Sequence, residues 1–370
     1  MDKAIEKKIA DAIGSNLDRL VTIDWRGQGQ IHPLYDALRQ QSDGPLTMRA
    51  AQRFVERVGE GDWVAVLTGF PVGPFDVFKA GKVAKQHTFS ADMVAPETDG
   101  PIAAALIARA VDLGFKAKPV IFCEDECVEI ARACCREAGL RLVTDFQKSL
   151  LMPHTVVVQP FTKDLGQARA DAKRILDELS PKAAISIERP GRNEKGAYHM
   201  ANGRAITDFV AKLDEIFDGV KARGGLTIGI GDLGNELGMG ALKEATRKLV
   251  FYGEQCRCGC GGGIGNVSKA DATVFGAVSD DAAYGFLACL AYLTGIPELL
   301  QSAEMETRVL EAAASHGAID GPSGVTVPSI DYLDVKNHVH QIELMRDIIG
   351  SPPRFLKLQP FFFGELISKG

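Results

Sequence analysis

Asp232, Asn235 and Glu236 are three oxygen-bearing side chains in the stretch 226–240, which also holds five glycines. Their i, i+3, i+4 spacing would place them on one face if the turn is helical. Two carboxylates and an amide can hold a hard divalent cation, bind an ammonium group or exchange protons. Helix capping explains one acid of the pair, but two acids beside Asn235 favour a site. We predict catalytic roles for all three and a candidate Mg or Mn site at Asp232 and Glu236.

A second group of candidates consists of Arg189 and Arg192, three residues apart beside Gly191. Planar guanidinium groups grip carboxylates through paired hydrogen bonds, so we predict that these two hold a substrate carboxylate. A structural ion pair with Glu188 or Asp99 is the alternative.

Other polar residues and one glycine stand where apolar runs end. We predict that they line the same substrate site, and they are Thr68, Gly69, Asp99, Glu188, Tyr198 and Ser279. No nucleophilic serine elbow and no plausible Cys–His pair accompanies them, which argues against hydrolases of those types.

Cys256, Cys258 and Cys260 alternate in a glycine-rich stretch. A metal or cluster site normally takes four thiolate or imidazole ligands, and no fourth is evident nearby, so a reduced surface loop is the favoured interpretation. His199 could exchange protons, although a lone histidine is more often simply hydrogen-bonded. His338 and His340 face different ways on a helix and make a poor metal pair.

The elements that must position these residues alternate along the chain. Continuous apolar runs typical of strands covered on both faces occur at 62–68, 119–123, 155–159, 183–188, from 226 and at 272–278. Helical patterns separate or follow them, at 102–113, 126–138, 163–179, 206–223, 241–251, 281–293, 297–316 and 337–349. This alternation predicts a doubly wound, largely parallel sheet flanked by helices, a three-layer α/β/α fold. The strand ends then meet at one edge, where such folds bind ligands.

Two local features bear on that edge. Pro101 suits the first position of a helix, and Asp99 or Thr98 could cap it. The segment 72–98 shows little periodicity and carries lysines, so it could cover an anionic ligand or be a solvated loop.

The composition limits the class of protein. The chain has 370 residues and a formal net charge of −6, which argues against nucleic acid as a main partner. No apolar run approaches the ~20 residues of a membrane helix. We expect a cytoplasmic protein that acts on a small amino acid, without membrane or nucleic-acid partners, and that could form homo-oligomers. The predicted organisation is a helical segment 1–60, an α/β domain 61–350 and a peripheral tail 351–370.

Four motifs in this order resemble the D-glutamate cyclase family: Thr-Gly-Phe-Pro at 68–71, Glu-Thr-Asp-Gly-Pro at 97–101, Glu-Arg-Pro-Gly-Arg at 188–192 and the glycine-rich run 229–240. The likeness extends from about residue 17 to 349. Two departures bear on the substrate more than on the fold. Leu233 stands where the family usually has glycine, and residues 279–283 read Ser-Asp-Asp-Ala-Ala in place of Ser-Asn-Trp-Gly-Gly.

The resemblance implies a lyase that converts D-glutamate into 5-oxo-D-proline by intramolecular dehydration, and the reverse. It implies that Arg189 and Arg192 hold the α-carboxylate and that Asp99 orients a reacting group. Asp232 or Glu236 would deprotonate the amine or hold a metal. A hydrolase or amide-bond enzyme acting on another small amino acid or lactam is one alternative, and a non-catalytic protein that binds small anions is another.

Overall fold

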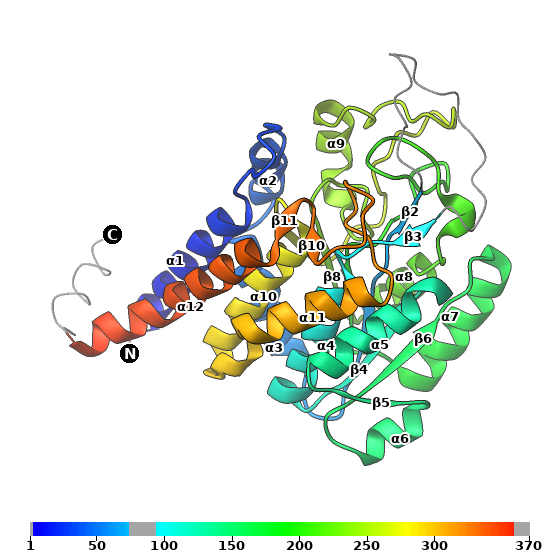
Figure 1. The fold of residues 1–370 in the computed structure, drawn as a ribbon. Coiled ribbons are helices and arrows are strands. Elements are labelled where there is room, and N and C mark those ends of the chain that lie inside the picture. The colour runs from blue at the N-terminus through cyan, green and yellow to red at the C-terminus, as the bar shows by residue number, and fades with distance from the viewer. Residues whose placement is uncertain (1–2, 74–93, 359–370) are drawn as a thin grey trace.

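A seven-stranded sheet forms the centre of the protein in the computed structural model, which describes residues 3–73 and 94–358 (Figure 1). Every pairing in it is parallel, and the strand order is β5-β6-β4-β1-β7-β8-β9. The strands are β1 (Trp63–Leu67), β4 (Lys118–Cys123), β5 (Arg141–Val143), β6 (Thr155–Pro160), β7 (Ala183–Ile187), β8 (Leu226–Gly231) and β9 (Ala272–Phe275). The predicted α/β class and parallel sheet are confirmed.

Both faces of the sheet are apolar, which explains the continuous apolar runs. In β1, Val64 and Val66 belong to the hydrophobic core on one face, whereas Ala65 and Leu67 belong to the core on the other. All five residues of this strand are buried. Because successive side chains point to opposite faces, a strand covered twice cannot show polar alternation.

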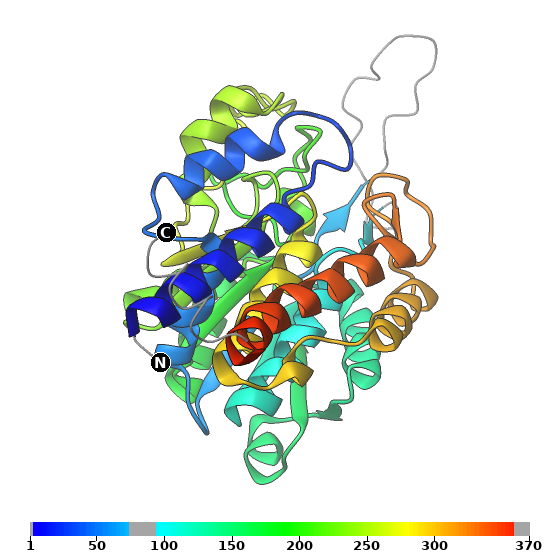
Figure 2. The same cartoon turned by 90° about the vertical axis from the view of Figure 1, so that its left-hand side faces the viewer.

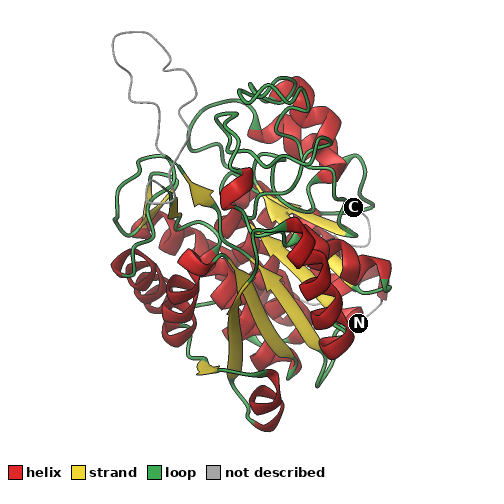
Figure 3. Ribbon diagram, turned by 90° about the vertical axis from the view of Figure 1, so that its right-hand side faces the viewer, coloured by secondary structure: helices red, strands yellow, loops and turns green. Residues whose placement is uncertain are grey.

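Helices cover both faces, as Figures 1 and 3 show, in the three-layer arrangement that was predicted. On one face lie α3 (Leu46–Arg57), α4 (Pro101–Phe115), α5 (Val128–Glu137) and α10 (Ser279–Thr294). On the other lie α7 (Leu165–Leu179) and α8 (Asp214–Ala222), with α6 (Phe146–Leu151) near the edge. Among the described helices, none is both long and apolar enough to cross a membrane.

Further helices pack on the first of these layers. They are α1 (Lys3–Val21), α11 (Ala303–Ser315) and α12 (Val335–Leu358), and Figure 2 shows α1 and α12 side by side. Above the sheet edge, α2 (Ile31–Arg39) packs against α9 (Lys243–Leu249). Short pairs β2 (Pro71–Val72) with β3 (Ala95–Pro96) and β10 (Ser329–Ile330) with β11 (Leu333–Asp334) lie in the connecting loops.

The strand order places a topological switch at the middle of the sheet. From β1 the chain passes to β4 and then to the edge strand β5, turns back to β6 between them, and crosses to β7 on the other side of β1. The carboxyl ends of β1 and β7 therefore flank the crevice where open α/β sheets bind ligands.

Two helices near this crevice are capped by acids from distant parts of the chain. The Asp280 carboxylate accepts hydrogen bonds from the backbone N–H groups of Gly100 (2.8 Å) and Ala103 (3.2 Å) at the start of α4. The Asp99 carboxylate accepts from Ser279 (3.2 Å) and Asp280 (2.8 Å) at the start of α10. The prediction that Asp99 or Thr98 caps α4 is wrong, because the cap comes from 180 residues away.

Some predicted limits differ from the observed ones. The pattern 206–223 forms the 3₁₀ turn η3 (Thr207–Phe209) and then α8, because the backbone N–H groups of Ala211 and Lys212 donate to Glu124 and Thr162, in a different part of the chain. The pattern 297–316 divides into the 3₁₀ turn η5 (Pro297–Leu299) and α11. The predicted boundary at 351 falls inside α12, although the division into three parts stays a prediction. Most of the segment 72–98 lies outside the described residues.

Candidate active site

A cavity of about 270 Å³ opens at the carboxyl ends of the central strands. Side chains from the loops after β1, β7 and β8 line it together with residues far apart in the sequence. The lining consists of Arg26, Gln28, Phe70, Val72, Glu97, Asp99, Glu188, residues 200–202, Asp232, Leu233, Asn235, Glu236, Gly321, Pro322 and Asp331. Six of these residues carry carboxyl groups, and among the described residues of the lining only Arg26 is cationic.

The loop after β8 is held by one of its own acids. The Glu236 carboxylate accepts hydrogen bonds from the backbone N–H groups of Asp232 (3.3 Å), Leu233 (2.9 Å) and Gly234 (2.7 Å). The turn is therefore not helical, and the chain reverses at Gly234, where φ is +100°. Leu233 lies outside the left-handed region, so its Cβ is compatible with the backbone there.

Asp232 and Asp331 face each other across Arg26. The guanidinium donates to Asp331 (3.0 Å) and Asp232 (3.3 Å), and also to the carbonyl oxygen of Ala277 (2.8 Å). Burial raises the pKa of Asp232 to about 7, even though Arg26 lowers it. Burial likewise raises the pKa of Asp331 to about 7. A carboxyl group that titrates near neutral pH is suited to exchanging protons with a substrate.

Three further carboxyl groups complete the acidic wall. Burial, together with the neighbouring acids, raises the pKa values of Glu97, Asp99 and Glu188 well above their ordinary range. Glu188 accepts a hydrogen bond from the Ser279 hydroxyl and has φ of +34°, a conformation that is costly for a residue with a Cβ. Strained backbone at a buried acid is typical of functional sites.

Asn235 offers an unused acceptor in the cavity. Its side-chain N–H donates to the backbone carbonyl of His199 (3.1 Å), which fixes the orientation of the amide. Its Oδ1 atom is buried and, among the described residues, has no hydrogen-bond partner. Because an unpaired buried acceptor is costly, this atom is suited to an N–H group of a ligand or to a cation.

The carboxylates form two overlapping groups that fit a divalent cation. In the first, Asp99, Asp232 and Asp331 each offer an oxygen within 4.8 Å of the others. In the second, Glu188, Asp232 and Glu236 do the same. Oxygen-only ligands at these distances suit Mg or Mn, and Asp232 belongs to both groups.

The amino-acid sequence is similar to known proteins over most of its length. The family model described as "D-glutamate cyclase-like, C-terminal" matches residues 17–346. The chain belongs to the D-glutamate cyclase-like family. It is also similar to the mitochondrial D-glutamate cyclase of Homo sapiens, with 29% identity over 189 residues, which cover 44% of this chain and 29% of the human protein. The chain therefore matches less than a third of the length of that relative.

The cavity of this D-glutamate cyclase-like chain contains five of the predicted site residues, namely Asp99, Glu188, Asp232, Asn235 and Glu236. It does not contain the two arginines. Arg189 is fully buried beneath the sheet edge, where it pairs with Glu124 and donates to the carbonyl oxygens of Gly69 (2.6 Å), Thr68 and Ala211.

Arg192 points toward the surface of α8. It contacts Asp218 (2.6 Å), Glu215 (3.5 Å) and Asp214 (3.7 Å). Both arginines thus form structural ion pairs, but with partners other than Glu188 and Asp99.

The remaining predicted residues support the site from outside it. Thr68 and Gly69 supply the carbonyl groups that hold Arg189. The Tyr198 hydroxyl donates to Asp214 (2.7 Å), and Ser279 donates to two lining residues, through its hydroxyl to Glu188 and through its backbone N–H to Asp99.

Sequence reasoning missed Arg26, Glu97 and Asp331 as lining residues of the D-glutamate cyclase-like cavity. Arg26 stands in a glycine-containing loop and Glu97 in the 97–101 motif, so both had a local signal. Asp331 lies in a short polar segment between β10 and β11 and had none.

Proposed function

We propose that this D-glutamate cyclase-like protein is a lyase that interconverts D-glutamate and 5-oxo-D-proline by intramolecular dehydration. Family membership supports the class of reaction. The observation that carries the assignment to this cavity is Asp232, which is buried, paired with Arg26, shared by both carboxylate groups and has a pKa near 7.

The reaction releases and consumes no protons overall, so it needs a group that carries protons from nitrogen to oxygen. The substrate ammonium must lose two protons as its nitrogen forms a bond to the carbon of the γ-carboxyl group, and one oxygen of that carboxylate leaves as water by taking up two protons. The ammonium therefore supplies both protons of that water. One carboxyl group that accepts a proton from nitrogen and returns it to oxygen serves both ends, and a pKa near neutral favours both transfers.

We assign the proton transfer to Asp232. Asn235 accepts a hydrogen bond from the amine through its unpaired Oδ1 atom. Arg26 binds a substrate carboxylate, because three of its N–H groups hold Asp331, Asp232 and Ala277 and the others remain to donate. Holding both ends of the substrate in one small cavity also brings the reacting atoms together.

A divalent cation fits the same carboxylates. Glu188, Asp232 and Glu236 would hold Mg or Mn, and a bound cation would polarise the γ-carboxyl group and offset the surplus of acids. Because Asp232 belongs to this group, cation binding would compete with its role as a proton carrier.

The direct test incubates the purified chain separately with D-glutamate, L-glutamate and both enantiomers of 5-oxoproline, and analyses the products by chiral chromatography with mass detection. We expect turnover of the D compounds, and loss of turnover in Asp232→Asn. Full turnover in that variant would refute the assignment. Parallel reactions with EDTA, Mg or Mn decide between the two roles: activity that persists in EDTA supports proton transfer by Asp232.

The departures from the family motif make other substrates a useful comparison. Leu233 lines the cavity where the family usually has glycine, so it narrows the space for the ligand. A panel of small amino acids and lactams in the same assay tests this. Turnover confined to another lactam would replace the proposed substrate, and ligand-induced thermal stabilisation without turnover would indicate a binding protein.

A further inference from the structure

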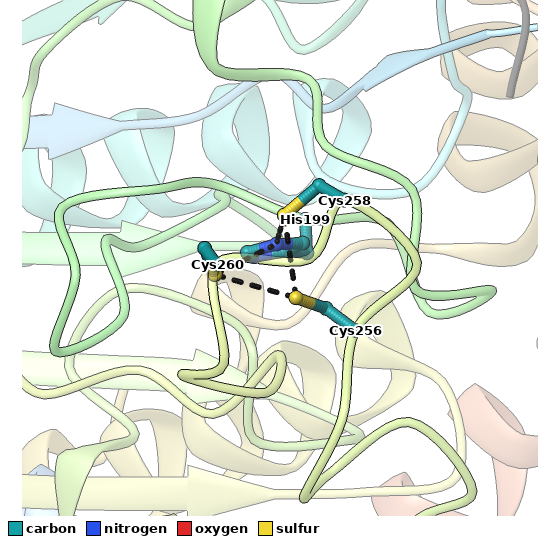
Figure 4. Close-up of side chains that lie close together, drawn as sticks. All are labelled: His199, Cys256, Cys258 and Cys260. Carbon is teal, nitrogen blue, oxygen red and sulfur yellow. Dashed lines mark hydrogen bonds between the residues drawn. The ribbon is translucent and has the colours of Figure 1, made fainter.

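Three cysteines and a histidine gather at a place separate from the acidic cavity. They are Cys256, Cys258, Cys260 and His199, and one ligand atom of each lies within 4.8 Å of those of the others. Figure 4 shows the three sulfur atoms and the imidazole pointing toward one another. The sequence suggests only three ligands, because His199 is 57 residues before the first cysteine and only the fold brings it close.

The backbone explains how alternate residues of one loop converge. Gly259, Gly261 and Gly263 all have positive φ, between +63° and +78°. A residue with a Cβ seldom adopts this conformation, so the glycines let the loop curl around a point instead of running straight. The Sγ atom of Cys256 consequently lies 3.2 Å from that of Cys258 and 3.3 Å from that of Cys260.

The distances agree with four ligands around one ion. The Nε2 atom of His199 lies 3.2 Å from the sulfur of Cys258 and 3.9 Å from that of Cys260. Zinc lies about 2.3 Å from thiolate sulfur and about 2.0 Å from imidazole nitrogen, which separates neighbouring tetrahedral ligand atoms by about 3.5–3.8 Å. Three of these ligand-atom separations, at 3.2–3.3 Å, are slightly shorter than this range, and the fourth, at 3.9 Å, is slightly longer.

A second residue supports the site in the manner of a metal centre. The Asn193 side chain donates to the sulfur of Cys260 (3.3 Å) and to the carbonyl oxygen of Gly263 (2.7 Å). N–H donors to coordinated sulfur orient ligands and stabilise thiolates. The Asn193 oxygen in turn accepts from the backbone N–H groups of Lys195 (2.9 Å) and Ala197 (3.0 Å), two residues before His199.

We propose that His199, Cys256, Cys258 and Cys260 bind one zinc ion in a closed, structural site. Three thiolates and one imidazole form a set that is typical of structural zinc, and four protein ligands leave no position for a substrate. A disulfide is the competing chemistry, but the sulfur atoms are 3.2 Å or more apart and all three thiols are free, whereas a disulfide bond measures about 2.05 Å.

The ion would stabilise the position of one wall of the acidic cavity. The carbonyl oxygen of His199 accepts the hydrogen bond that orients Asn235, and the next three residues, 200–202, line the cavity. The backbone N–H of Arg257 donates to the carbonyl oxygen of Gly203 (2.8 Å), which ties the cysteine loop to the same turn. Zinc therefore links the loop 256–260 to the wall that holds a predicted substrate contact.

The test measures metal in the full chain, purified without chelator from cells grown with added zinc. Elemental analysis should find about one zinc per chain. The substitutions Cys256→Ser, Cys258→Ser, Cys260→Ser and His199→Gln should each reduce bound zinc at least about tenfold. Cys135→Ala and His316→Gln, which change a thiol and an imidazole elsewhere, should retain it. Asp232→Asn should also retain it, which separates this site from the acidic cavity.

A second measurement does not depend on the variants folding. Replacing zinc by Co(II) in the native chain should give thiolate-to-cobalt charge-transfer absorption and the visible bands of a tetrahedral site, and adding zinc should remove both. Zinc-free protein with a Cys256–Cys258 or Cys256–Cys260 disulfide in a non-reducing peptide map would overturn the proposal. Bound iron with visible absorbance before any exchange would overturn it as well.

Discussion

Asp232 is the residue on which the proposed chemistry depends, because it faces Arg26 on one side and the other cavity acids on the other. Asp232→Asn keeps the size of the side chain but removes both the exchangeable proton and the negative charge. We expect kcat/KM for D-glutamate to fall at least about 100-fold, the lower range for loss of a general acid–base group. Product formation at saturating and limiting substrate measures the change.

Asp177→Asn is the matched control for that variant. Asp177 pairs with Lys173 on α7 and with Arg223 just after α8, and none of the three lines the cavity. Its activity should equal that of the unmodified chain. Equal losses in both variants would show that the effect is not specific to the cavity.

Arg26 gives a separate prediction about substrate binding. Arg26→Gln removes the cationic group of the described lining, so a substrate carboxylate would face an acidic wall without a partner. We expect KM to rise about 10-fold or more, as for loss of a charge-assisted hydrogen bond, with a smaller effect on kcat. Steady-state kinetics separate the two constants.

Arg192→Gln is the counterpart, since the sequence pattern assigns the carboxylate to that residue. Its guanidinium contacts Asp218 and Glu215 outside the cavity, so KM should not change. A rise in KM for Arg192→Gln and none for Arg26→Gln would reverse the assignment.

The residue types needed for the site could be predicted from the sequence, but their partners could not. Asp232, Asn235 and Glu236 line the cavity because they share one short turn after β8, although that turn is not helical as their spacing suggested. Arg189 has the right type and lies beside the cavity acid Glu188, yet burial pairs it with Glu124, 65 residues away. Such long-range pairing leaves no local signal.

At the scale of elements, the start of α4 and the start of α10 hold each other in place. Asp280→Ala would leave the buried N–H groups of Gly100 and Ala103 without acceptors. We expect a loss of about 2–6 kcal/mol in the free energy of unfolding, because each of the two unsatisfied buried donors costs about 1–3 kcal/mol. Urea denaturation followed by circular dichroism measures it.

The cap of α7 provides the comparison. Asp164 accepts from the backbone N–H of Gln167 (2.7 Å) at an exposed helix start. Asp164→Ala should cost about 1 kcal/mol, since water can replace the lost acceptor. A similar cost for the two variants would show that burial of the Asp280 cap contributes nothing.

The existence and type of the long elements could be predicted because the apolar period is a local property. The residues at which the elements begin and end could be predicted less well. The 206–223 pattern reads as one helix, but the backbone N–H of Lys212 donates to the carbonyl oxygen of Thr162 (3.0 Å), and that of Ala211 donates to Glu124 (2.9 Å). These tertiary bonds outweigh helical propensity, which is a weak preference.

At the scale of the whole molecule, a buried histidine joins α12 to the helix that follows β9. The His338 Nδ1 atom lies 2.8 Å from Asp281 on α10, and both side chains are fully buried. Burial alone lowers the pKa of His338, but the carboxylates of Asp281, Glu306 and Asp280 raise it to about 9. The charged imidazole therefore stabilises the packing of α12 on the rest of the fold.

This pair determines how stability should change with pH. Because the folded pKa of His338 lies above the unfolded value of 6.5, the contribution is complete below about pH 6.5 and is lost as pH rises through about 9. The raised pKa of His338 corresponds to a contribution of about 3 kcal/mol to the free energy of unfolding. In His338→Gln the fall in the free energy of unfolding between about pH 6.5 and 9 should be smaller by that amount.

His340→Gln, an exposed change on the same helix, is the control, and its free energy of unfolding should change with pH as in the unmodified chain. Urea titrations at several pH values decide the matter, and parallel curves for the His338→Gln variant and the unmodified chain would mean that the imidazole is neutral in the folded protein.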